Sequence, residues 1–468
     1  MVYLIRKALT IAGSDSGGGA GIQADLKTFA ALGVHGLCVI TSVTAQNTYE
    51  VRAVFDLPLE MIKAQFEAVV DDIGVDAAKT GMLNRKEVVE LVAQLVKNYN
   101  IPTVVDPVMV AKSGAPLLRE DAVESLVKHL IPVATVVTPN KFEAEKITGI
   151  TIKSVDDAKK AAKAIVEDLG ARAAVVKGGH IEGENSIDIL YVDGVFRELR
   201  GARVPTKNTH GTGCSFSAAI AAELAKGKPV VEAVRIAKEF ITKAIEYSLS
   251  IGRGYGPVNP TAWIYVPAEK FYVLENLRKA VELVEENSEY IYPLIPEVGM
   301  NIAMALPKPY TRTLNDVAAI PGRIVKIGNK VKAVAPPDFG VSKHMAKAIL
   351  TVMQFDDRIR AAANLKYSEE FVEIAKKLGF SVSFYDRTQE PPEIKTVEGA
   401  SIPWGIEQAI KAVGGKVPDI IYHRGDWGKE PMINIFGETA VDVVNKLLTI
   451  ARKIKNKTSN DFVSTYIR

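Results

Sequence analysis

Short continuous runs of β-branched and apolar residues, separated by segments with helical spacing, constrain the fold of this chain more than any other feature. The runs occupy Ala8–Ala12, Leu37–Val43, Thr103–Asp106, Thr135–Thr138 and Ala173–Lys177, and helical spacing occupies Ile22–Leu32 and Ile62–Ile73. A strand that is apolar throughout needs cover on both faces, and an intervening helix favours parallel pairing. The pattern therefore predicts an α/β fold with a doubly wound, mostly parallel sheet.

The chain is too long for one core, because single hydrophobic cores stop growing at about 250–300 residues and this chain has 468. Glycine and proline crowd residues 252–260 and end the helical pattern. We therefore expect one domain over 1–265 and a second, smaller α/β domain over 266–468. In the second domain, Lys270–Glu286 is predicted to be helical, and strands are predicted at Ile324–Ile327, Val382–Tyr385 and Ile420–Tyr422.

Bulk composition argues against several classes of protein. The net charge of +3 is too small to indicate nucleic acid or a membrane surface as a partner, and no apolar run reaches the roughly 18 residues of a membrane span. Two cysteines, Cys38 and Cys214, make no disulfide framework. We expect a cytoplasmic protein that acts on small molecules.

A glycine-rich loop at Asn208–Cys214 precedes the alanine-rich segment Ser215–Ala222. Gly211 and Gly213 permit backbone N–H groups to converge, and a helix N-terminus adds partial positive charge. Such a loop binds anions, but it lacks the Gly-Lys-Ser/Thr ending of a Walker-type P-loop. A second glycine-rich loop follows the first strand, and Gln46, Met82 and Asp106 follow other strands. Because sites in α/β sheets form at the carboxyl ends of strands, these residues are predicted to converge.

Together, the motifs of the first domain resemble hydroxymethylpyrimidine/phosphomethylpyrimidine kinase of the ribokinase superfamily, across residues 5–260. The matching stretches are 8–16, 19–27, 41–48, 79–83, 106–109, 138–140, 176–180 and 211–214. The resemblance implies a ribokinase-like fold and two successive ATP-dependent phosphorylations, first of the pyrimidine alcohol and then of its monophosphate. It also implies Mg²⁺ as cofactor and a homodimer.

The resemblance further implies roles for individual residues. Substrate would contact Gly13, Asp25, Gln46, Met82 and Asp106, with the Gln46 amide on the aminopyrimidine edge and Met82 on its face. Lys177 would contact the transferred phosphate, which Gly211 and Gly213 would cradle. Asn140 and Glu143 would place the nucleotide and Mg²⁺, with Glu143 and Asp106 acting on the metal through water.

Cys214 stands where the wider superfamily has an aspartate base, in agreement with the pyrimidine kinases. A thiol at a helix N-terminus is expected to have a lowered pKa. The cysteine would then accept the proton of the substrate hydroxymethyl group, or merely lie against it.

The second domain resembles the ThiN-type thiamine-phosphate synthase domain over about residues 285–455. The matching stretches are 300–303, 316–324, 339–346, 364–368 and 419–425. The implied reaction joins the pyrimidine pyrophosphate to a thiazole phosphate and releases pyrophosphate, with Arg323 and His344 as candidate catalytic residues. Two alternatives stay open: a thiamine-phosphate-binding regulatory module in place of the synthase, and a sugar or pyridoxal kinase with an unrelated appendage.

Overall fold

The structure is a computed structural model that describes residues 5–110, 114, 117–180, 185–397, 399–426 and 429–466. The chain divides into two compact units, Met1–Tyr265 and Val266–Arg468. The glycine- and proline-rich stretch 252–260 directly precedes this division. None of the helices in the described part combines the length and the apolar character that a membrane crossing requires.

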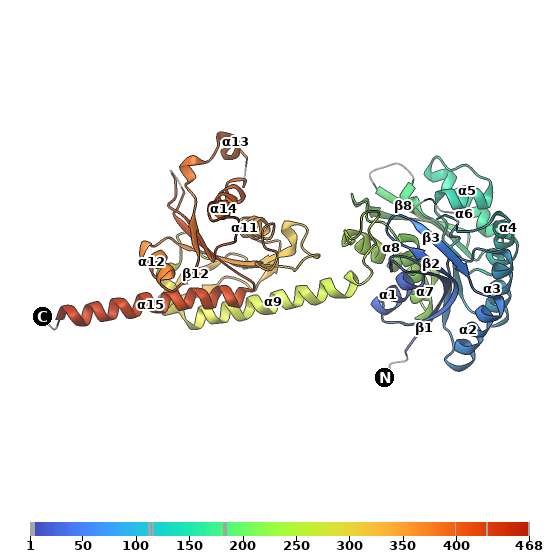
Figure 1. Cartoon of the computed structure of the whole chain (residues 1–468), viewed down its shortest axis with the longest axis horizontal. Coiled ribbons are helices and arrows are strands. Elements are labelled where there is room, and N and C mark those ends of the chain that lie inside the picture. The colour runs from blue at the N-terminus through green and yellow to red at the C-terminus, as the bar shows by residue number, and fades with distance from the viewer. Residues whose placement is uncertain are drawn as a thin grey trace. The chain divides into compact units, whose positions relative to one another are not determined.

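The first unit is built on a nine-stranded sheet in the order β3-β2-β1-β4-β5-β6-β7-β8-β9 (Figure 1). Its strands are β1 (Lys7–Asp15), β2 (His35–Gln46), β3 (Val51–Asp56), β4 (Ala77–Thr80), β5 (Thr103–Val105), β6 (Val136–Val137), β7 (Ala173–Val176), β8 (Asn185–Val192) and β9 (Val195–Ala202). The six strands from β2 to β7 in this order pair in parallel, and β3, β8 and β9 are antiparallel additions. The predicted doubly wound, mostly parallel sheet is confirmed.

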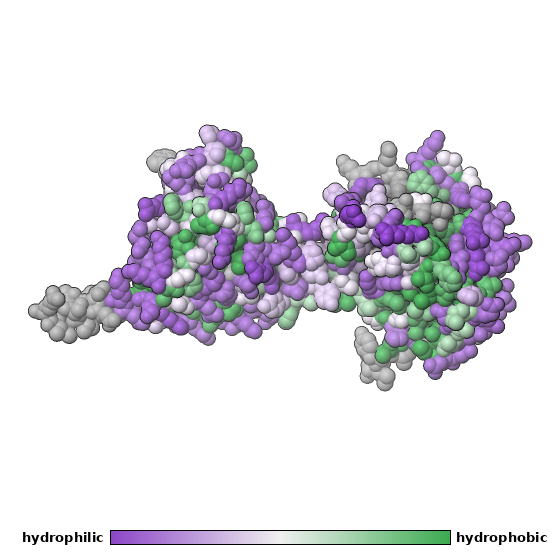
Figure 2. Space-filling view, viewed as in Figure 1, coloured by the Kyte–Doolittle hydropathy of each residue, from purple (hydrophilic) through white to green (hydrophobic). Residues whose placement is uncertain are grey.

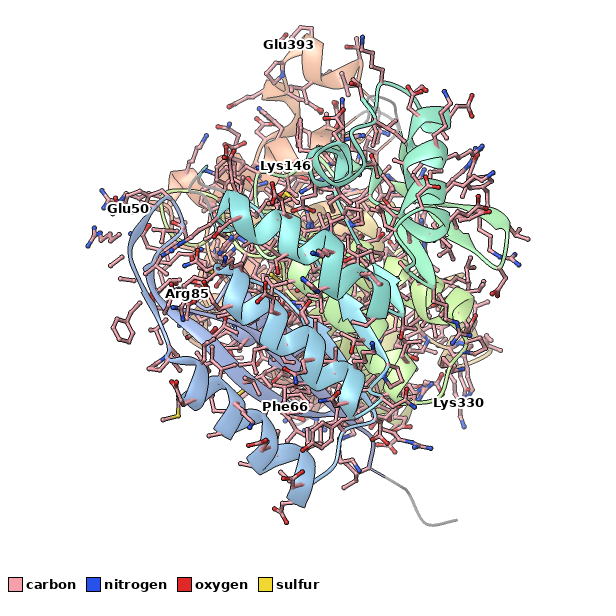
Figure 3. The ribbon with its side chains drawn as sticks, turned by 90° about the vertical axis from the view of Figure 1, so that its right-hand side faces the viewer. Glu50, Phe66, Arg85, Lys146, Lys330 and Glu393 are labelled. Carbon is pink, nitrogen blue, oxygen red and sulfur yellow. The ribbon has the colours of Figure 1, made fainter. Side chains whose placement is uncertain are left out.

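Helices cover both faces of this sheet. Those of the first unit are α1 (Gly21–Ala31), α2 (Leu59–Asp72), α3 (Lys86–Asn98), α4 (Glu120–Ser125), α5 (Lys141–Thr148), α6 (Val155–Glu167), α7 (Thr212–Ala225) and α8 (Val230–Glu246). Alternate residues of β1 enter separate cores: Leu9 packs with α2 and α3, and Ala8 packs with α1, α7 and α8. On α2, Phe66 is fully buried, with its ring centroid 5.4 Å from that of Tyr99 (Figure 3). Strands β4, β5, β6 and β7 are buried at every residue. This burial on both faces explains why the central strands are continuously apolar.

The second unit holds a seven-stranded sheet in the order β14-β11-β10-β15-β18-β17-β16 and a separate β12-β13 ribbon. The strands are β10 (Ile302–Ala305), β11 (Val317–Ala319), β12 (Ile324–Ile327), β13 (Lys330–Ala333), β14 (Asp338–Phe339), β15 (Ala361–Lys366), β16 (Val382–Phe384), β17 (Ile420–His423) and β18 (Met432–Gly437). Strands β16 and β17 pair in parallel, and the other described pairs are antiparallel. The predicted run at 324–327 is a strand, but it belongs to the ribbon.

The two faces of the second sheet carry different helices. The helices are α9 (Ala262–Glu286), which begins in the first unit, α10 (Ser288–Ile291), α11 (Lys343–Val352), α12 (Glu369–Lys377), α13 (Pro392–Lys395), α14 (Ser401–Ala412) and α15 (Ala440–Tyr466). Helices α11 and α14 pack with Ala303, Ala362 and Phe436 on one face. Helix α15 contacts β15, β18 and α12 on the other face. The second unit is therefore also a layered α/β structure.

Candidate active site

The residues predicted to form the kinase site follow successive parallel strands of the first unit. Gln46 is the last residue of β2, Met82 and Asp106 follow β4 and β5, and Asn140 and Lys177 follow β6 and β7. Parallel strands end at the same edge of a sheet, so these side chains share one edge with the N-terminus of α7. The contacts described next show which of them meet.

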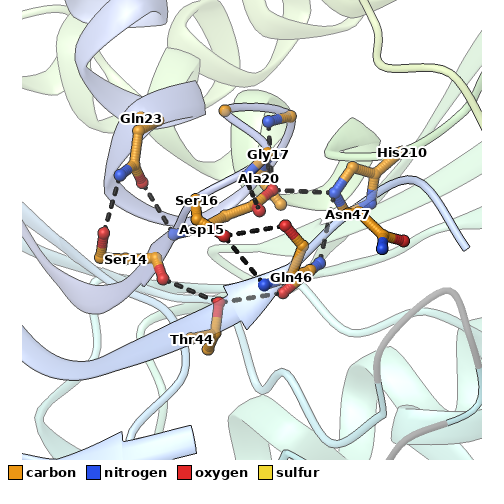
Figure 4. A network of polar contacts seen from close by, with 12 residues as sticks. Ser14, Asp15, Ser16, Gly17, Ala20, Gln23, Thr44, Gln46, Asn47 and His210 are labelled. Atoms are coloured by element: carbon orange, nitrogen blue, oxygen red, sulfur yellow. Dashed lines mark hydrogen bonds and ion pairs between the residues drawn. The ribbon is translucent and has the colours of Figure 1, made fainter. Parts of the chain in front are cut away.

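Asp15, at the end of β1, ties the two glycine-rich loops together (Figure 4). Its carboxylate accepts hydrogen bonds from the backbone N–H groups of Gly17 and Ala20, both at 2.8 Å, and contacts His210 Nε2 at 2.9 Å. Although burial raises it, the pKa of Asp15 is held below its ordinary value by His210 and these backbone donors. The first loop therefore surrounds a carboxylate, while His210 belongs to the second loop.

Gln46 lies beside this network. Its Nε2 atom is 3.4 Å from His210 Nε2, and its Oε1 atom accepts a hydrogen bond from Thr44 at 3.3 Å. Our sequence reasoning assigned no role to Asp15 or His210, although both lie beside the glycines that it singled out. The arrangement holds the Gln46 amide at the end of β2, where it can form hydrogen bonds with the edge of a planar ligand.

The helix that follows the second glycine-rich loop begins inside the loop itself. Helix α7 starts at Thr212, three residues before the alanine-rich segment, so Gly213 and Cys214 lie in its first turn. Gly211 has a φ of +78°, and a Cβ atom there would overlap the carbonyl oxygen of Gly19. A Cβ atom on Gly213 would lie 3.3 Å from Lys177 Nζ and 3.4 Å from Asp106 Oδ2. The first turn of α7 therefore lies directly against a cation and a carboxylate.

Asp106 and Lys177 form an ion pair at this helix N-terminus. Lys177 Nζ lies 3.1 Å from Asp106 Oδ1, and Thr138 and Ser217 each donate a hydrogen bond to Asp106 at 3.3 Å. Burial lowers the pKa of Lys177, but the carboxylates of Asp106 and Glu143 outweigh burial and raise this pKa above its ordinary value. Lys177 is therefore a permanent cation fixed beside backbone N–H donors, as phosphate binding requires.

Asn140 and Glu143 form the N-terminal cap of α5. Glu143 N donates to Asn140 Oδ1 at 3.0 Å, and Asn140 N donates to Glu143 Oε2 at 2.7 Å. Burial raises the pKa of Glu143 to about 7; Lys177 opposes the rise and Asp106 adds to it. The carboxylates of Glu143 and Asp106 repel one another, and a bound cation would reduce this repulsion. Carboxylate oxygens are also ligands that suit hydrated Mg²⁺. No group of three or more His, Cys, Asp and Glu side chains is arranged to hold a metal within the described ranges.

Asp25 lies in a fully buried ion pair that the sequence did not indicate. Its Oδ2 atom is 2.9 Å from Lys79 Nζ and accepts a hydrogen bond from Thr10 at 2.6 Å. Burial raises the pKa of Asp25, while Lys79 and Thr10 oppose the rise. Asp25 Oδ1 has no hydrogen-bond partner in the part of the chain that the structure describes. The predicted contact of Asp25 with substrate stays a prediction.

Met82 and Gly13 line the neighbouring strand ends. A Cβ atom on Gly13 would lie 3.2 Å from the Met82 sulfur, and the Met82 carbonyl accepts a hydrogen bond from Thr41 at 2.7 Å. Gly13 thus leaves the space that the thioether occupies. Met82 thus contacts Gly13 of β1 and Thr41 of β2, at the sheet edge where Gln46 ends β2.

The lowered pKa that we expected for Cys214 is wrong. Burial raises its pKa to about 11, and the carboxylates of Asp25 and Asp106 add to the rise, while Lys79 opposes it. The partial charge of the helix N-terminus is too small to offset these effects. At neutral pH Cys214 is therefore a neutral thiol.

We expect Cys214→Ser to keep its kinase rate within about tenfold of the wild type, because phosphoryl transfer depends mainly on positioning and charge stabilisation. Alkylation of Cys214 by iodoacetamide should accelerate about tenfold per pH unit up to about pH 10, since only the thiolate reacts. Mass-spectrometric alkylation rates and pH–rate profiles measure both effects. Rapid alkylation at pH 7, or a rate loss above about a thousandfold in the serine variant, would contradict a neutral thiol.

Arg323 and His344 have different surroundings in the second unit. Arg323 follows β11 with a φ of +71°, and its guanidinium donates to the Val298 carbonyl. His344 is exposed in the first turn of α11, which follows β14. Because β11 and β14 are antiparallel, the chain leaves the sheet at opposite edges after these two strands. The catalytic role of each of these two residues stays a prediction.

Comparison with known proteins agrees with this two-part organisation. Residues 15–259 match the family model described as phosphomethylpyrimidine kinase, and residues 276–449 match thiamine-phosphate synthase ThiN. A hydroxymethylpyrimidine/phosphomethylpyrimidine kinase of Bacillus subtilis is 49% identical over 261 residues, which cover 55% of this chain and 96% of that protein.

Solved structures resemble the first unit. Bacillus subtilis pyridoxal kinase in complex with ADP is 44% identical, with a TM-score of 0.52, over 55% of this chain and 98% of that chain. Staphylococcus aureus pyridoxal kinase with AMP-PCP and pyridoxal is 38% identical, with a TM-score of 0.52, over 56% of this chain and 96% of that chain.

One relative matches both units. The bifunctional thiamine biosynthesis protein ThiDN of Methanocaldococcus jannaschii is 38% identical over 460 residues, which cover 96% of this chain and 99% of that protein. With both family models matched in the same order, this chain belongs to the ThiDN family of bifunctional thiamine biosynthesis enzymes, which join a kinase to a thiamine-phosphate synthase.

Proposed function

We propose that residues 1–265 phosphorylate 4-amino-5-hydroxymethyl-2-methylpyrimidine and then its monophosphate, with ATP and Mg²⁺. The observation that carries this proposal is the placement of Lys177 and Asp106 against the first turn of α7, at the sheet edge that also holds Gln46 and Met82. A cation and a helix N-terminus stabilise a phosphoryl group in transfer. The Gln46 amide can both donate to and accept from an aminopyrimidine edge.

The proposal gives each residue of this site a distinct task. Lys177 and the backbone N–H groups after Gly211 would hold the transferred phosphate. Glu143 and Asp106 would hold Mg²⁺ through water, and the ion would neutralise charge on the nucleotide phosphates. Cys214, as a neutral thiol, would lie against the substrate hydroxymethyl group rather than withdraw its proton.

Incubating the purified chain with ATP, Mg²⁺, the pyrimidine alcohol and thiazole phosphate tests the whole proposal. Thiamine phosphate should accumulate, with pyrimidine mono- and pyrophosphate as intermediates. Because the relatives of known structure include pyridoxal kinases, pyridoxal should be added as a competitor. A preference for pyridoxal over the pyrimidine would contradict the proposed substrate.

We further propose that residues 266–468 are the synthase unit, which couples pyrimidine pyrophosphate to 4-methyl-5-(2-phosphoethyl)thiazole. We propose that the whole chain works in the cytoplasm. Departure of pyrophosphate needs cations on the leaving group more than a nucleophile on the protein. The Arg323 guanidinium and the exposed His344 are the candidates for that task. A chain without ATP, supplied with both phosphorylated precursors, should form thiamine phosphate; a regulatory module would bind that product without forming it.

Arg323→Ala should lower kcat for coupling by about 10²- to 10³-fold, since one charge-stabilising donor is worth that much, and leave both kinase rates unchanged. Steady-state assays of the two activities on one preparation measure this. The matched control is Arg358→Ala, whose guanidinium is exposed and pairs with Asp356 at 2.8 Å. Equal loss of both activities in Arg323→Ala would indicate misfolding and contradict the assigned role.

We also propose that the chain forms a homodimer through an apolar patch on β2 and β3. Val43 on β2 and Phe55 on β3 are paired across the two strands and are 46% and 69% exposed, and Met61 on the neighbouring helix α2 is 52% exposed. Figure 2 shows hydrophobic surface on the first unit. Phe55→Asp should shift the chain from dimer to monomer in light scattering without loss of secondary structure, because a buried unpaired charge opposes association. Ile251→Asp, at another exposed apolar residue, is the control. An unchanged mass for Phe55→Asp would contradict this interface.

A further inference from the structure

A cluster of polar side chains lies where the two parallel strands of the second unit end. Tyr385 and Arg387 follow β16, Glu390 follows the short turn Arg387–Gln389, and His423 is the last residue of β17. The Tyr385 and His423 rings are 5.2 Å apart. Carboxyl ends of parallel strands are where α/β sheets form small-molecule sites. Neither Arg323 nor His344 belongs to this cluster.

The charged members of the cluster have unused hydrogen-bonding atoms. Arg387 Nη2 and Glu390 Oε2 are 3.8 Å apart, and the two side chains are 11% and 3% exposed. Arg387 Nε and Glu390 Oε1 are buried without a hydrogen-bond partner among the described residues. Burial of a polar atom without a partner is destabilising, and buried polar atoms in native proteins are usually paired. The cluster therefore offers one donor and one acceptor to a ligand.

Asn434 adds an amide on the same face of the sheet. It lies opposite Asn364 on β15 and Ile421 on β17, two residues from the position opposite His423. The Asn364 amide is occupied, because it accepts from Asn301 N at 2.7 Å and donates to the Gly299 carbonyl at 3.3 Å. The half-buried Asn434 side chain makes no hydrogen bond to the described part of the chain. Asn434 thus has a free donor and a free acceptor.

The unpaired atoms of Arg387, Glu390 and Asn434 match the edge of a ligand that both donates and accepts hydrogen bonds. A phosphate group offers acceptors only, and it would meet the Glu390 carboxylate as a like charge. Burial and Arg387 lower the pKa of His423 to about 4, so this ring adds no positive charge at neutral pH. Among the reactants of the proposed coupling step, the pyrimidine pyrophosphate carries an amino group beside a ring nitrogen, and the thiazole phosphate carries no N–H donor.

We propose that Glu390, Arg387 and Asn434 form the aminopyrimidine subsite of the synthase unit. Glu390 accepts from the amino group, Arg387 Nε donates to an acceptor on the ring, and the Asn434 amide binds along the same edge. This assignment rests on the proposed coupling function. It leaves the pyrophosphate for cations elsewhere, and Arg323 follows β11 at the edge where β16 and β17 also end.

The test compares pyrimidine pyrophosphate with its des-amino analogue on the full chain at pH 8 without ATP. Wild type should prefer the amino compound by about 10- to 100-fold in kcat/KM, the value of one or two buried hydrogen bonds. Asn434→Leu and the double variant Arg387→Met/Glu390→Met should lower this preference to below about threefold. The double variant removes both charges together, so neither is left buried and unpaired.

Controls separate this subsite from a general defect. KM for thiazole phosphate and both kinase rates should stay unchanged, and Asn445→Leu, at an exposed position on α15, should keep the full preference. Retained preference in both subsite variants overturns the assignment. If the wild type forms no thiamine phosphate, the coupling function fails instead. Calorimetric titration of the two pyrimidines into a Gln46→Leu chain then measures the preference without turnover, and equal affinities overturn the subsite.

Discussion

Lys177→Ala is expected to lower kcat for both phosphorylation steps by about 10²- to 10³-fold, with little change in KM for the pyrimidine. The reason is geometric: Lys177 Nζ lies 3.1 Å from Asp106 and faces the first turn of α7, where the transferred phosphate would lie. A preorganised cation gains most of its value as charge develops in the transition state. Rapid-quench assays with labelled ATP separate this effect from slow product release.

Removal of Lys177 also leaves Asp106 buried without its cation, so the fold must be checked in the same preparation. The double variant Lys177→Met/Asp106→Asn removes both charges and should restore the melting temperature without restoring the rate. Lys159→Ala is the matched control, because that lysine forms a half-exposed ion pair with Glu198 at 2.9 Å; such pairs contribute about 0–1 kcal/mol. An undiminished rate in Lys177→Ala would remove it from the phosphate site.

The fold of the first unit was largely predictable, because its parallel strands are continuously apolar and its helices intervene regularly. The second unit was less so. Strands β10 and β15 are rich in alanine, with the sequences IAMA and AAANLK, and no local β-propensity marks them. Ala303, Ala305 and Ala362 are buried against α11 and α14, where small side chains permit close packing. These segments are strands because of their packing against other elements, and a short stretch of sequence does not contain that information.

The kinase site shows the same division. Residues at strand ends, such as Gln46 and Met82, were predictable because the sheet topology brings strand ends together. The Asp25–Lys79 ion pair joins a residue inside α1 to one inside β4, and neither position has a local signal for it. For Cys214, the local rule of a lowered pKa at a helix N-terminus failed because burial and two carboxylates act in the opposite direction. Electrostatic surroundings of this kind depend on the assembled fold.

Gly211→Ala is expected to abolish kinase activity to below about one percent of the wild type and to leave coupling by the second unit intact. The φ of +78° costs an alanine about 1–2 kcal/mol by itself. The larger effect is steric, because the new methyl group overlaps the carbonyl oxygen of Gly19. The Gly19 carbonyl belongs to the backbone, so it cannot rotate away as a flexible side chain can. Relief therefore requires the two glycine-rich loops to separate, which displaces the N-terminus of α7 from Lys177 and Asp106.

Gly227 offers a control that isolates the steric effect from backbone strain. Its φ is +81°, and a Cβ atom there would meet nothing within 4 Å. Gly227→Ala should therefore lower the melting temperature by the strain alone and keep the kinase rates. A misplacement of about 1 Å at the phosphate costs about 10²-fold in rate, so Gly211→Ala should lose activity far beyond its loss of stability. If both alanine variants lose stability and activity in proportion, contact between Gly211 and Gly19 does not position the phosphate loop, and the helix N-terminus must be held in place by other contacts.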